Sequence, residues 1–212
     1  MEGAREAAGA DDGIAVTTSI RSRRDVLKVT VAGGGILLLG GMAAERLLGA
    51  TQAKPSAAQD RKILNYALLL EYLQAAFYED ALSRARLTGE LREFAEIVGN
   101  HERAHVAYLK KALGSSARSK PAFAFGRATK DQQTFAKTAR ILEDAGVAAY
   151  NGQAANLTKK ALTPAVEIVS VEGRHAAWIR DIVGAEPAPR AADPGATVGE
   201  ITAKLKSLGF VR

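Results

Sequence analysis

Residues 102–105 read Glu-Arg-Ala-His and residues 172–175 read Glu-Gly-Arg-His, and this shared Glu-x-x-His spacing decides the prediction of the fold. On an α-helix, residues three apart are separated by about 60° around the axis and about 4.5 Å along it, so the two side chains can bind one metal pair. The chain has 212 residues, of which 3 are histidine. Two histidines placed in this way have a chance probability of about 1%, so the pairs indicate a helical metal site.

Four apolar stripes with helical spacing follow Gln59, and each contains a glutamate where an aliphatic residue is expected. Glu102 and Glu172 belong to the Glu-x-x-His pairs, whereas Glu71 and Glu143 stand alone in their stripes. The predicted helices cover residues 59–83, 89–113, 131–151 and 164–184. Because this region lacks the alternation of strands, the sequence predicts an all-α fold, a four-helix bundle with these glutamates on its inner faces.

The segments between the stripes predict how the helices are connected. Thr163 followed by Pro164 predicts an N-cap and a first-turn proline for the fourth helix. Residues 115–130 form a connection long enough to cross the length of a bundle. Three of the 6 prolines fall within residues 187–194 and mark a linker. The capping-box spacing of residues 197–200 predicts a short C-terminal helix that packs on the bundle.

Four buried carboxylates need a compensating positive charge, because an isolated buried carboxylate costs several kcal/mol. Two divalent cations would balance the four negative charges and leave the assembled site neutral. Oxygen ligands with two imidazoles suit iron or manganese and disfavour a structural zinc site. The sequence therefore predicts a dinuclear metal site with the candidate ligands Glu71, Glu102, His105, Glu143, Glu172 and His175.

Composition excludes several other classes of protein. With 47% hydrophobic and 25% charged residues, the chain is globular rather than disordered or fibrous. The absence of cysteine excludes disulfides, thiolate metal sites and thiol catalysis. The net charge of +6 is mild, and the presumed folded part has no run of Lys or Arg longer than two, so we expect no nucleic-acid binding.

The N-terminus carries features of an export signal. Residues 22–28 read Ser-Arg-Arg-Asp-Val-Leu-Lys and precede an uncharged, glycine-rich run of residues 29–44, which is shorter than the ~20 apolar residues of a membrane span. This pattern resembles a twin-arginine translocation signal, with valine where that signal usually has phenylalanine. It predicts a signal segment of residues 1–53, recognised by the twin-arginine translocation machinery of a bacterium or archaeon. The protein would then be periplasmic or extracellular, or membrane-anchored if the signal is not cleaved.

The order Glu, Glu-x-x-His, Glu, Glu-x-x-His resembles the di-iron carboxylate proteins of the ferritin-like superfamily. Residues 64–73 and 142–152 are similar to the exported ferritin-like family that includes plant desiccation-related proteins, and the match covers about residues 59–184. The resemblance implies a ferritin-like antiparallel four-helix bundle with a long crossover over residues 54–186, followed by the linker and C-terminal helix over residues 187–212. It also implies ligand roles, with Glu71 and Glu143 terminal, Glu102 and Glu172 bridging, and His105 and His175 as nitrogen donors.

Some neighbouring residues depart from the family pattern or leave two interpretations. Many di-iron proteins have an aspartate directly before each Glu-x-x-His, but His101 and Val171 occupy these places, so the partners of the histidine rings are not predicted. We expect His101 to face a neighbouring helix or water. Tyr78 and Tyr150 lie seven residues after the single glutamates, and we expect core packing to explain them better than hydrogen bonds to the site or a radical role. Gly146 leaves room for dioxygen or for close helix packing.

The resemblance implies a function in which two iron ions react as Fe(II) with dioxygen or peroxide, as in a ferroxidase or oxidase. Two alternatives stay open. A dimanganese site would remove peroxide as a catalase-like enzyme does. An exported stress or desiccation protein would carry a structural or vestigial metal site without being an enzyme. The predicted partners are metal ions and dioxygen or peroxide, with a homo-oligomer left open.

Overall fold

The computed structural model describes residues 54–210, and this part of the chain is all-helical, as predicted. The long helices are α3 (Ala57–Arg84), α4 (Gly89–Leu113), α5 (Gln132–Gln153) and α6 (Lys159–Ile182), followed by the short α7 (Val198–Ser207). The 3-10 turns η1 (Gly114–Ser116) and η2 (Ala154–Asn156) follow α4 and α5. The predicted signal segment, residues 1–53, lies outside the described residues. None of the described helices is long and apolar enough to cross a membrane.

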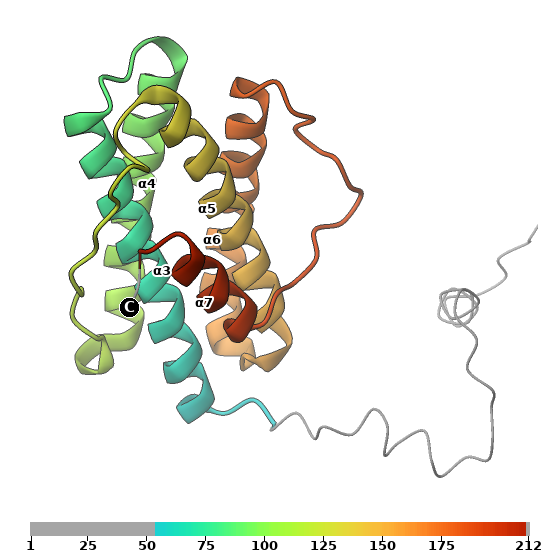
Figure 1. The fold of residues 1–212 in the computed structure, drawn as a ribbon. Helices are drawn as coiled ribbons and strands as arrows, with labels where there is room; N and C mark the ends of the chain where they lie inside the picture. Colours follow the sequence, from blue (N-terminus) through green and yellow to red (C-terminus); the bar gives the residue numbers. More distant parts are fainter. Residues whose placement is uncertain (1–53, 211–212) are drawn as a thin grey trace, which may run out of the picture. The chain divides into compact units, whose positions relative to one another are not determined.

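α3 and α4 pack side by side in opposite directions, and so do α5 and α6 (Figure 1). α4 and α5 begin at the same end of the bundle, where the Gln132 side chain accepts hydrogen bonds from the backbone N–H and the hydroxyl of Thr88 at 2.9 and 3.1 Å. At the opposite end, Asp60 in the first turn of α3 accepts hydrogen bonds from Thr158, directly before α6, at 2.9 and 2.6 Å. Residues 114–131 therefore connect the two ends of the bundle, which is the predicted long crossover.

The Asn65 side chain ties this crossover to α3. Its amide donates to the Ser116 carbonyl at 2.9 Å and accepts a hydrogen bond from the Arg118 backbone N–H at 2.8 Å. The Tyr72 hydroxyl adds a bond to the Arg118 carbonyl at 3.3 Å. The long connection is therefore held by side chains of α3 and needs no secondary structure of its own.

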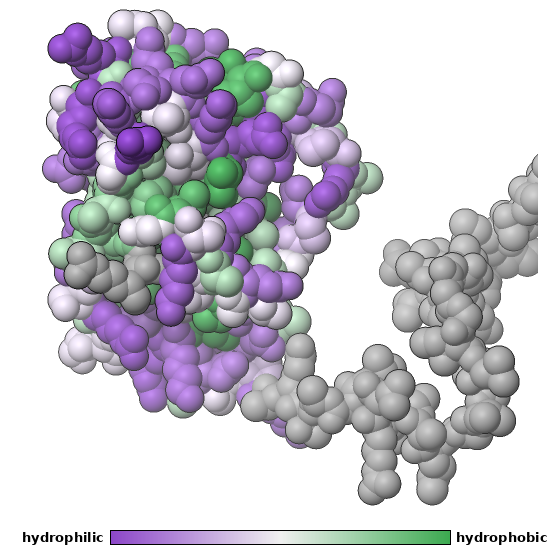
Figure 2. Space-filling model, in the orientation of Figure 1, coloured by the Kyte–Doolittle hydropathy of each residue, from purple (hydrophilic) through white to green (hydrophobic). Residues whose placement is uncertain are grey.

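Two apolar clusters fill the bundle on either side of a polar layer. One cluster is rich in aromatic residues and includes the fully buried Phe77, Phe94 and Phe135. The other is mainly aliphatic and includes the fully buried Leu68 and Leu109. The surface is largely hydrophilic on the face drawn in Figure 2, with smaller groups of hydrophobic residues between the hydrophilic ones. The glutamates of the four stripes lie between the two clusters, so little water reaches them.

The predicted start of the fourth helix is wrong by about one turn. α6 begins at Lys159, with Thr158 as its N-cap residue, and Pro164 lies inside the helix. Asp60 holds Thr158, and Leu157 and Ala161 beside it are buried in the aliphatic cluster. These tertiary contacts outweigh the intrahelical hydrogen bond that the proline removes near the helix start.

The C-terminal helix agrees with its prediction. Thr197 and Glu200 form the complete capping box at the start of α7. Ile201 and Leu205 of α7 and Phe210 after it are buried in the aromatic-rich cluster. α7 therefore covers the same end of the bundle that the phenylalanine rings fill.

Candidate metal centre

Each long helix brings its glutamate into the polar layer, because the apolar residues of the same stripe bury that face of the helix. Glu71 comes from α3, Glu143 from α5, and the two Glu-x-x-His pairs from α4 and α6. All six candidate ligands are buried, with Glu102, Glu143 and Glu172 at 0% exposure. The structure therefore brings together every residue that the sequence singled out for this site.

The six side chains form two overlapping groups. The first contains Glu71, Glu102, His105 and Glu172, and the second contains Glu102, Glu143, Glu172 and His175. Within each group, one ligand atom from every residue lies within 4.8 Å of the others, so both groups could hold a metal ion. Glu102 and Glu172 are common to both groups, as bridging ligands would be.

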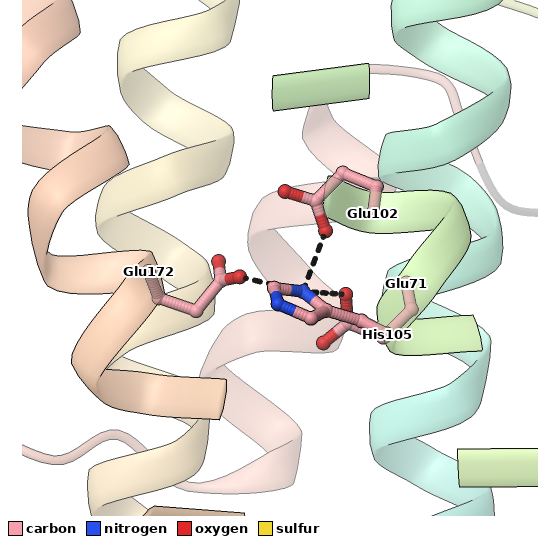
Figure 3. Close-up of side chains that lie close together, drawn as sticks. All are labelled: Glu71, Glu102, His105 and Glu172. Atoms are coloured by element: carbon pink, nitrogen blue, oxygen red, sulfur yellow. Dashed lines mark hydrogen bonds and ion pairs between the residues drawn. The ribbon is translucent and has the colours of Figure 1, made fainter. Parts of the chain in front are cut away.

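His105 faces three carboxylates with a single nitrogen atom (Figure 3). Its Nδ1 lies 3.2 Å from Glu71 Oε2, 3.3 Å from Glu102 Oε2 and 3.2 Å from Glu172 Oε1. An imidazole nitrogen carries at most one hydrogen, so it cannot donate a full hydrogen bond to all three oxygens. A cation between these atoms would satisfy all four of them.

His175 repeats this arrangement in the other half of the bundle. Its Nδ1 lies 3.2 Å from Glu102 Oε1, 3.3 Å from Glu143 Oε2 and 3.8 Å from Glu172 Oε1. Glu102 thus turns one oxygen toward each histidine. Glu71 and Glu143 each approach one histidine only. This arrangement is compatible with the bridging and terminal roles that the resemblance implied, and both these roles and the binding of ions stay predictions.

Several buried polar atoms in this layer have no hydrogen-bond partner among the described residues. They are Glu102 Oε1, Glu143 Oε2, both carboxylate oxygens of Glu172 and His175 Nδ1. Buried polar atoms without partners are costly, by about 1–3 kcal/mol for each group. Their convergence on one region, in a set of hard oxygen donors and two imidazoles, fits a pair of divalent iron or manganese ions.

Burial and mutual repulsion shift the protonation of the cluster. Burial and the charge of Glu71 raise the pKa of Glu102 well above its ordinary value, and burial and the charge of Glu102 do the same to the pKa of Glu172. Burial lowers the pKa of His105, but its contacts with the three glutamates outweigh burial and raise it to about 12. Without a cation, the cluster therefore retains protons that bound metal would displace.

Two tyrosines donate hydrogen bonds to Glu71 and Glu143, a role that the sequence favoured less than core packing. The Tyr150 hydroxyl donates to Glu71 Oε1 and the Tyr78 hydroxyl donates to Glu143 Oε1, both at 2.5 Å. Gln74 also donates to Glu143 Oε1, at 3.1 Å. The expectation of core packing was therefore incomplete, because both rings are buried and both hydroxyls bind the site. Burial and the adjacent carboxylates raise the pKa of both tyrosines well above its ordinary value, so both remain neutral donors.

His101 is the partner that the sequence could not assign to His175. Its Nδ1 lies 2.9 Å from His175 Nε2, and the two rings are nearly coplanar, with a centroid distance of 5.1 Å and an interplanar angle of 16°. His175 Nδ1 faces the carboxylates, so a metal held there would place the ring hydrogen on Nε2, where His101 would accept it. Val171 occupies the matching position on α6, and among the described residues His105 Nε2 has no hydrogen-bond partner.

The space beside Gly146 is filled by a carboxylate. A Cβ atom at this position would lie 2.7 Å from Glu172 Oε2 and 3.5 Å from Gln74 Oε1. Close packing at this glycine is therefore observed, and room for dioxygen stays a prediction. The missing side chain makes room for the carboxylate of Glu172, which belongs to both groups of candidate ligands.

A comparison with protein families agrees with the geometry. The family model described as a ferritin-like domain matches residues 59–185, more than half of the chain. No curated protein matches the chain. The matched region begins in α3 and ends just after α6, so it contains all six candidate ligands. The chain therefore belongs to the ferritin-like domain family.

Proposed function

We propose that this protein binds two iron ions between its four long helices and uses them to react Fe(II) with dioxygen or peroxide, as a ferroxidase or oxidase does. The observation that carries the proposal is the sharing of Glu102 and Glu172 between two groups of potential ligands. Four carboxylates and two neutral imidazoles carry four negative charges, which two divalent ions neutralise. The unpartnered oxygens of Glu102, Glu143 and Glu172 would then gain partners.

Two Fe(II) ions bound there supply one electron each, which reduces dioxygen to peroxide, or peroxide to water, with protons from the solvent. The chain prepares the ligands for this reaction. Tyr150 occupies Oε1 of Glu71 and leaves Oε2 facing His105. Tyr78 and Gln74 occupy Oε1 of Glu143 in the same way. Each terminal carboxylate is therefore oriented to offer one oxygen to a metal.

Manganese is the second candidate, because oxygen-rich ligand sets with two imidazoles suit Mn²⁺ as well as Fe²⁺. A dimanganese protein of this kind would release dioxygen from hydrogen peroxide. Metal analysis of protein recovered from its native compartment distinguishes the two, since loading during overexpression can insert the wrong ion. Manganese content with rapid dioxygen release would favour this alternative over iron.

The test is an anaerobic titration of the metal-free protein with Fe²⁺, followed by addition of dioxygen. We expect two ions per chain and consumption of dioxygen after mixing. Glu102→Gln removes a bridging carboxylate and should abolish binding of the ion pair. Glu79→Gln changes an exposed glutamate of the same bundle and should leave binding unchanged. A wild-type protein that binds no metal under these conditions would refute the proposal.

We also propose that residues 1–53 direct export through the twin-arginine pathway. The proposal is supported by the paired Arg23 and Arg24 ahead of an uncharged run. A pathway that moves folded proteins also suits a protein that acquires metal before transport. A fusion of residues 1–53 to a reporter should be exported, and replacing both arginines by lysine should retain it in the cytoplasm. Export of the doubly substituted fusion would contradict this assignment.

A further inference from the structure

Three aromatic rings form a continuous column from the polar layer to the protein surface. The Tyr78 ring of α3 lies 5.9 Å from the Phe94 ring of α4, and Phe94 lies 5.2 Å from the Trp178 ring of α6, with both pairs edge to face. The inner end of the column is the Tyr78 hydroxyl, which donates to Glu143. At its outer end, the half-buried Trp178 donates from Nε1 to the exposed Glu90 at 2.8 Å.

The chemistry of these rings differs along the column. Tyrosine and tryptophan are the aromatic side chains that lose one electron most readily, whereas phenylalanine resists oxidation. Trp178 is the only tryptophan of the chain. Tyr78 and Phe94 are fully buried, so protein rather than water fills the path between the redox-active rings. Phe94 therefore lies between two oxidisable side chains and does not itself become oxidised.

The other tyrosine of the cluster has no such connection. Tyr150 binds Glu71 as Tyr78 binds Glu143, and both rings are buried. Within residues 54–210, however, no other aromatic ring stacks on or packs edge to face against Tyr150. The two tyrosines are thus equivalent in their hydrogen bonds to carboxylates and different in their aromatic neighbours.

We propose that the Tyr78–Phe94–Trp178 column carries single electrons between the surface and the buried cluster, a role that rests on the proposed function of that cluster. Tyr78 gives one electron to the oxidised centre, and its phenol proton moves to Glu143 Oε1. Trp178 then gives an electron to the tyrosyl radical, and the proton returns to the phenol oxygen. A small one-electron reductant in solution restores the indole at the surface. The net transfer is one electron from solution to the centre, without transfer of a proton.

The first test uses the full chain without metal, so that it does not depend on the proposed function. A photogenerated ruthenium(III) polypyridyl complex oxidises the single tryptophan, and transient absorption follows the tryptophanyl radical and the tyrosyl radical that replaces it. The background variant Tyr108→Phe removes an exposed tyrosine, 41% accessible, that the oxidant would attack directly. We expect the radical to move from Trp178 to Tyr78, so the test follows the same path with the electron moving in the direction opposite to the proposed reduction of the centre.

Conservative variants identify the path. Tyr78→Phe keeps the ring and removes its redox activity, so the tryptophanyl radical should persist longer by an order of magnitude or more. Tyr150→Phe is the matched control, because it removes the equivalent hydroxyl from a ring outside the column, and it should leave the radical transfer unchanged. Phe94→Leu keeps an apolar side chain and should slow the transfer. Transfer that is equally fast in the Tyr78→Phe variant, or equally slowed by Tyr150→Phe, would overturn the proposal.

A second measurement uses the iron-loaded, oxidised protein with ascorbate as the reductant. Reduction of the ferric centre should be slowed several-fold by Trp178→Phe, while the number of bound ions stays at the wild-type value. Unchanged reduction in this variant would refute the role of Trp178 as the surface end of the path. Loss of metal binding in the wild type together with intact radical transfer would instead refute the proposed function and leave the column in place.

Discussion

Replacing Gly146 by alanine tests whether the bridging position of Glu172 depends on the absence of a side chain. The added Cβ would lie 2.7 Å from Glu172 Oε2, whereas ordinary contacts begin at 3.4 Å. The carboxylate must therefore move by the difference between these distances, about 0.7 Å. Without metal, no ion fixes the position of Glu172, and the helix gains about 0.8–1.0 kcal/mol of propensity from alanine. Overpacking costs about 1–3 kcal/mol, so the metal-free variant should lose roughly 0–2 kcal/mol of stability.

The effect should be larger on metal binding than on folding. A bridging carboxylate has to keep its position between two ions, and a displacement approaching 1 Å is costly at a site of this kind, so we expect the ion pair to bind about tenfold more weakly or worse. Calorimetric titration with Fe²⁺ or Mn²⁺ under anaerobic conditions measures the affinity. Thermal unfolding of the same samples without metal measures the stability.

Gly173→Ala provides the matched control for this substitution. Gly173 is the residue directly after Glu172 in α6, and a Cβ there would meet no atom within 4 Å. This variant should gain about 1 kcal/mol of stability, or about 2–4 °C in melting temperature, and bind metal as the wild type does. If Gly146→Ala also bound both ions with unchanged affinity, the reasoning that close approach of Glu172 requires this glycine would be refuted.

Three further predictions concern protonation, positioning and metal removal. The raised pKa values of Glu102 and Glu172 mean that protonation of these groups stabilises the metal-free fold. This stabilisation should be complete below the ordinary glutamate pKa of 4.5 and be lost as pH rises through the raised values. Denaturant unfolding at a series of pH values measures it, and a rise in metal-free stability over this range would contradict the prediction. His101→Ala should weaken the binding of one of two Co²⁺ ions because His175 loses its hydrogen-bond partner, and His101→Asp should restore that binding. Visible absorption of the Co²⁺ protein measures both variants. Equal loss of affinity for both ions in His101→Ala would count against a role specific to His175. Addition of a chelator should lower the melting temperature of the loaded protein, since free metal at a hundred times its dissociation constant adds about 2.7 kcal/mol to stability. Scanning calorimetry with and without the chelator measures this effect. Equal melting temperatures would show that the ions do not bind the folded state.

The inner faces of the helices could be predicted because periodicity alone places a residue on the core side. Glu71, Glu102, Glu143 and Glu172 each replace an aliphatic residue in a stripe, and the same packing that buries the stripe brings them together. The start of α6 could not be predicted in the same way. Thr163 and Pro164 are a local signal, whereas the observed start depends on Asp60, which lies 98 residues before Thr158 in the sequence.

The hydrogen-bond partners of the cluster were harder to predict than its candidate ligands for a related reason. The seven-residue spacing from Glu71 to Tyr78 shows that both belong to one helix face, but it does not show that Tyr78 binds the glutamate of α5 instead of its own. Each tyrosine binds the glutamate of the other helix, and this pairing depends on how α3 and α5 are rotated relative to each other. The sequence of one helix does not determine that rotation. His101 has the same difficulty, because its position on α4 predicts that it faces a neighbouring helix or water but does not identify His175 of α6 as its partner.

Each half of the cluster contains one single glutamate and one Glu-x-x-His pair, but the hydrogen-bond partners of these residues differ between the halves. In one half, Glu143 accepts hydrogen bonds from Tyr78 and Gln74, and the His175 ring is hydrogen-bonded to His101. In the other half, Glu71 accepts a hydrogen bond from Tyr150, and His105 Nε2 has no hydrogen-bond partner among the described residues. Ligands fixed by more hydrogen bonds lose less freedom when a metal binds, so the half with Glu143 and His175 should bind its ion more tightly. The electron column also ends on Glu143, so the better ordered half is the one connected to the surface. The differences between the halves therefore predict unequal roles for the two metals that we propose for this buried site.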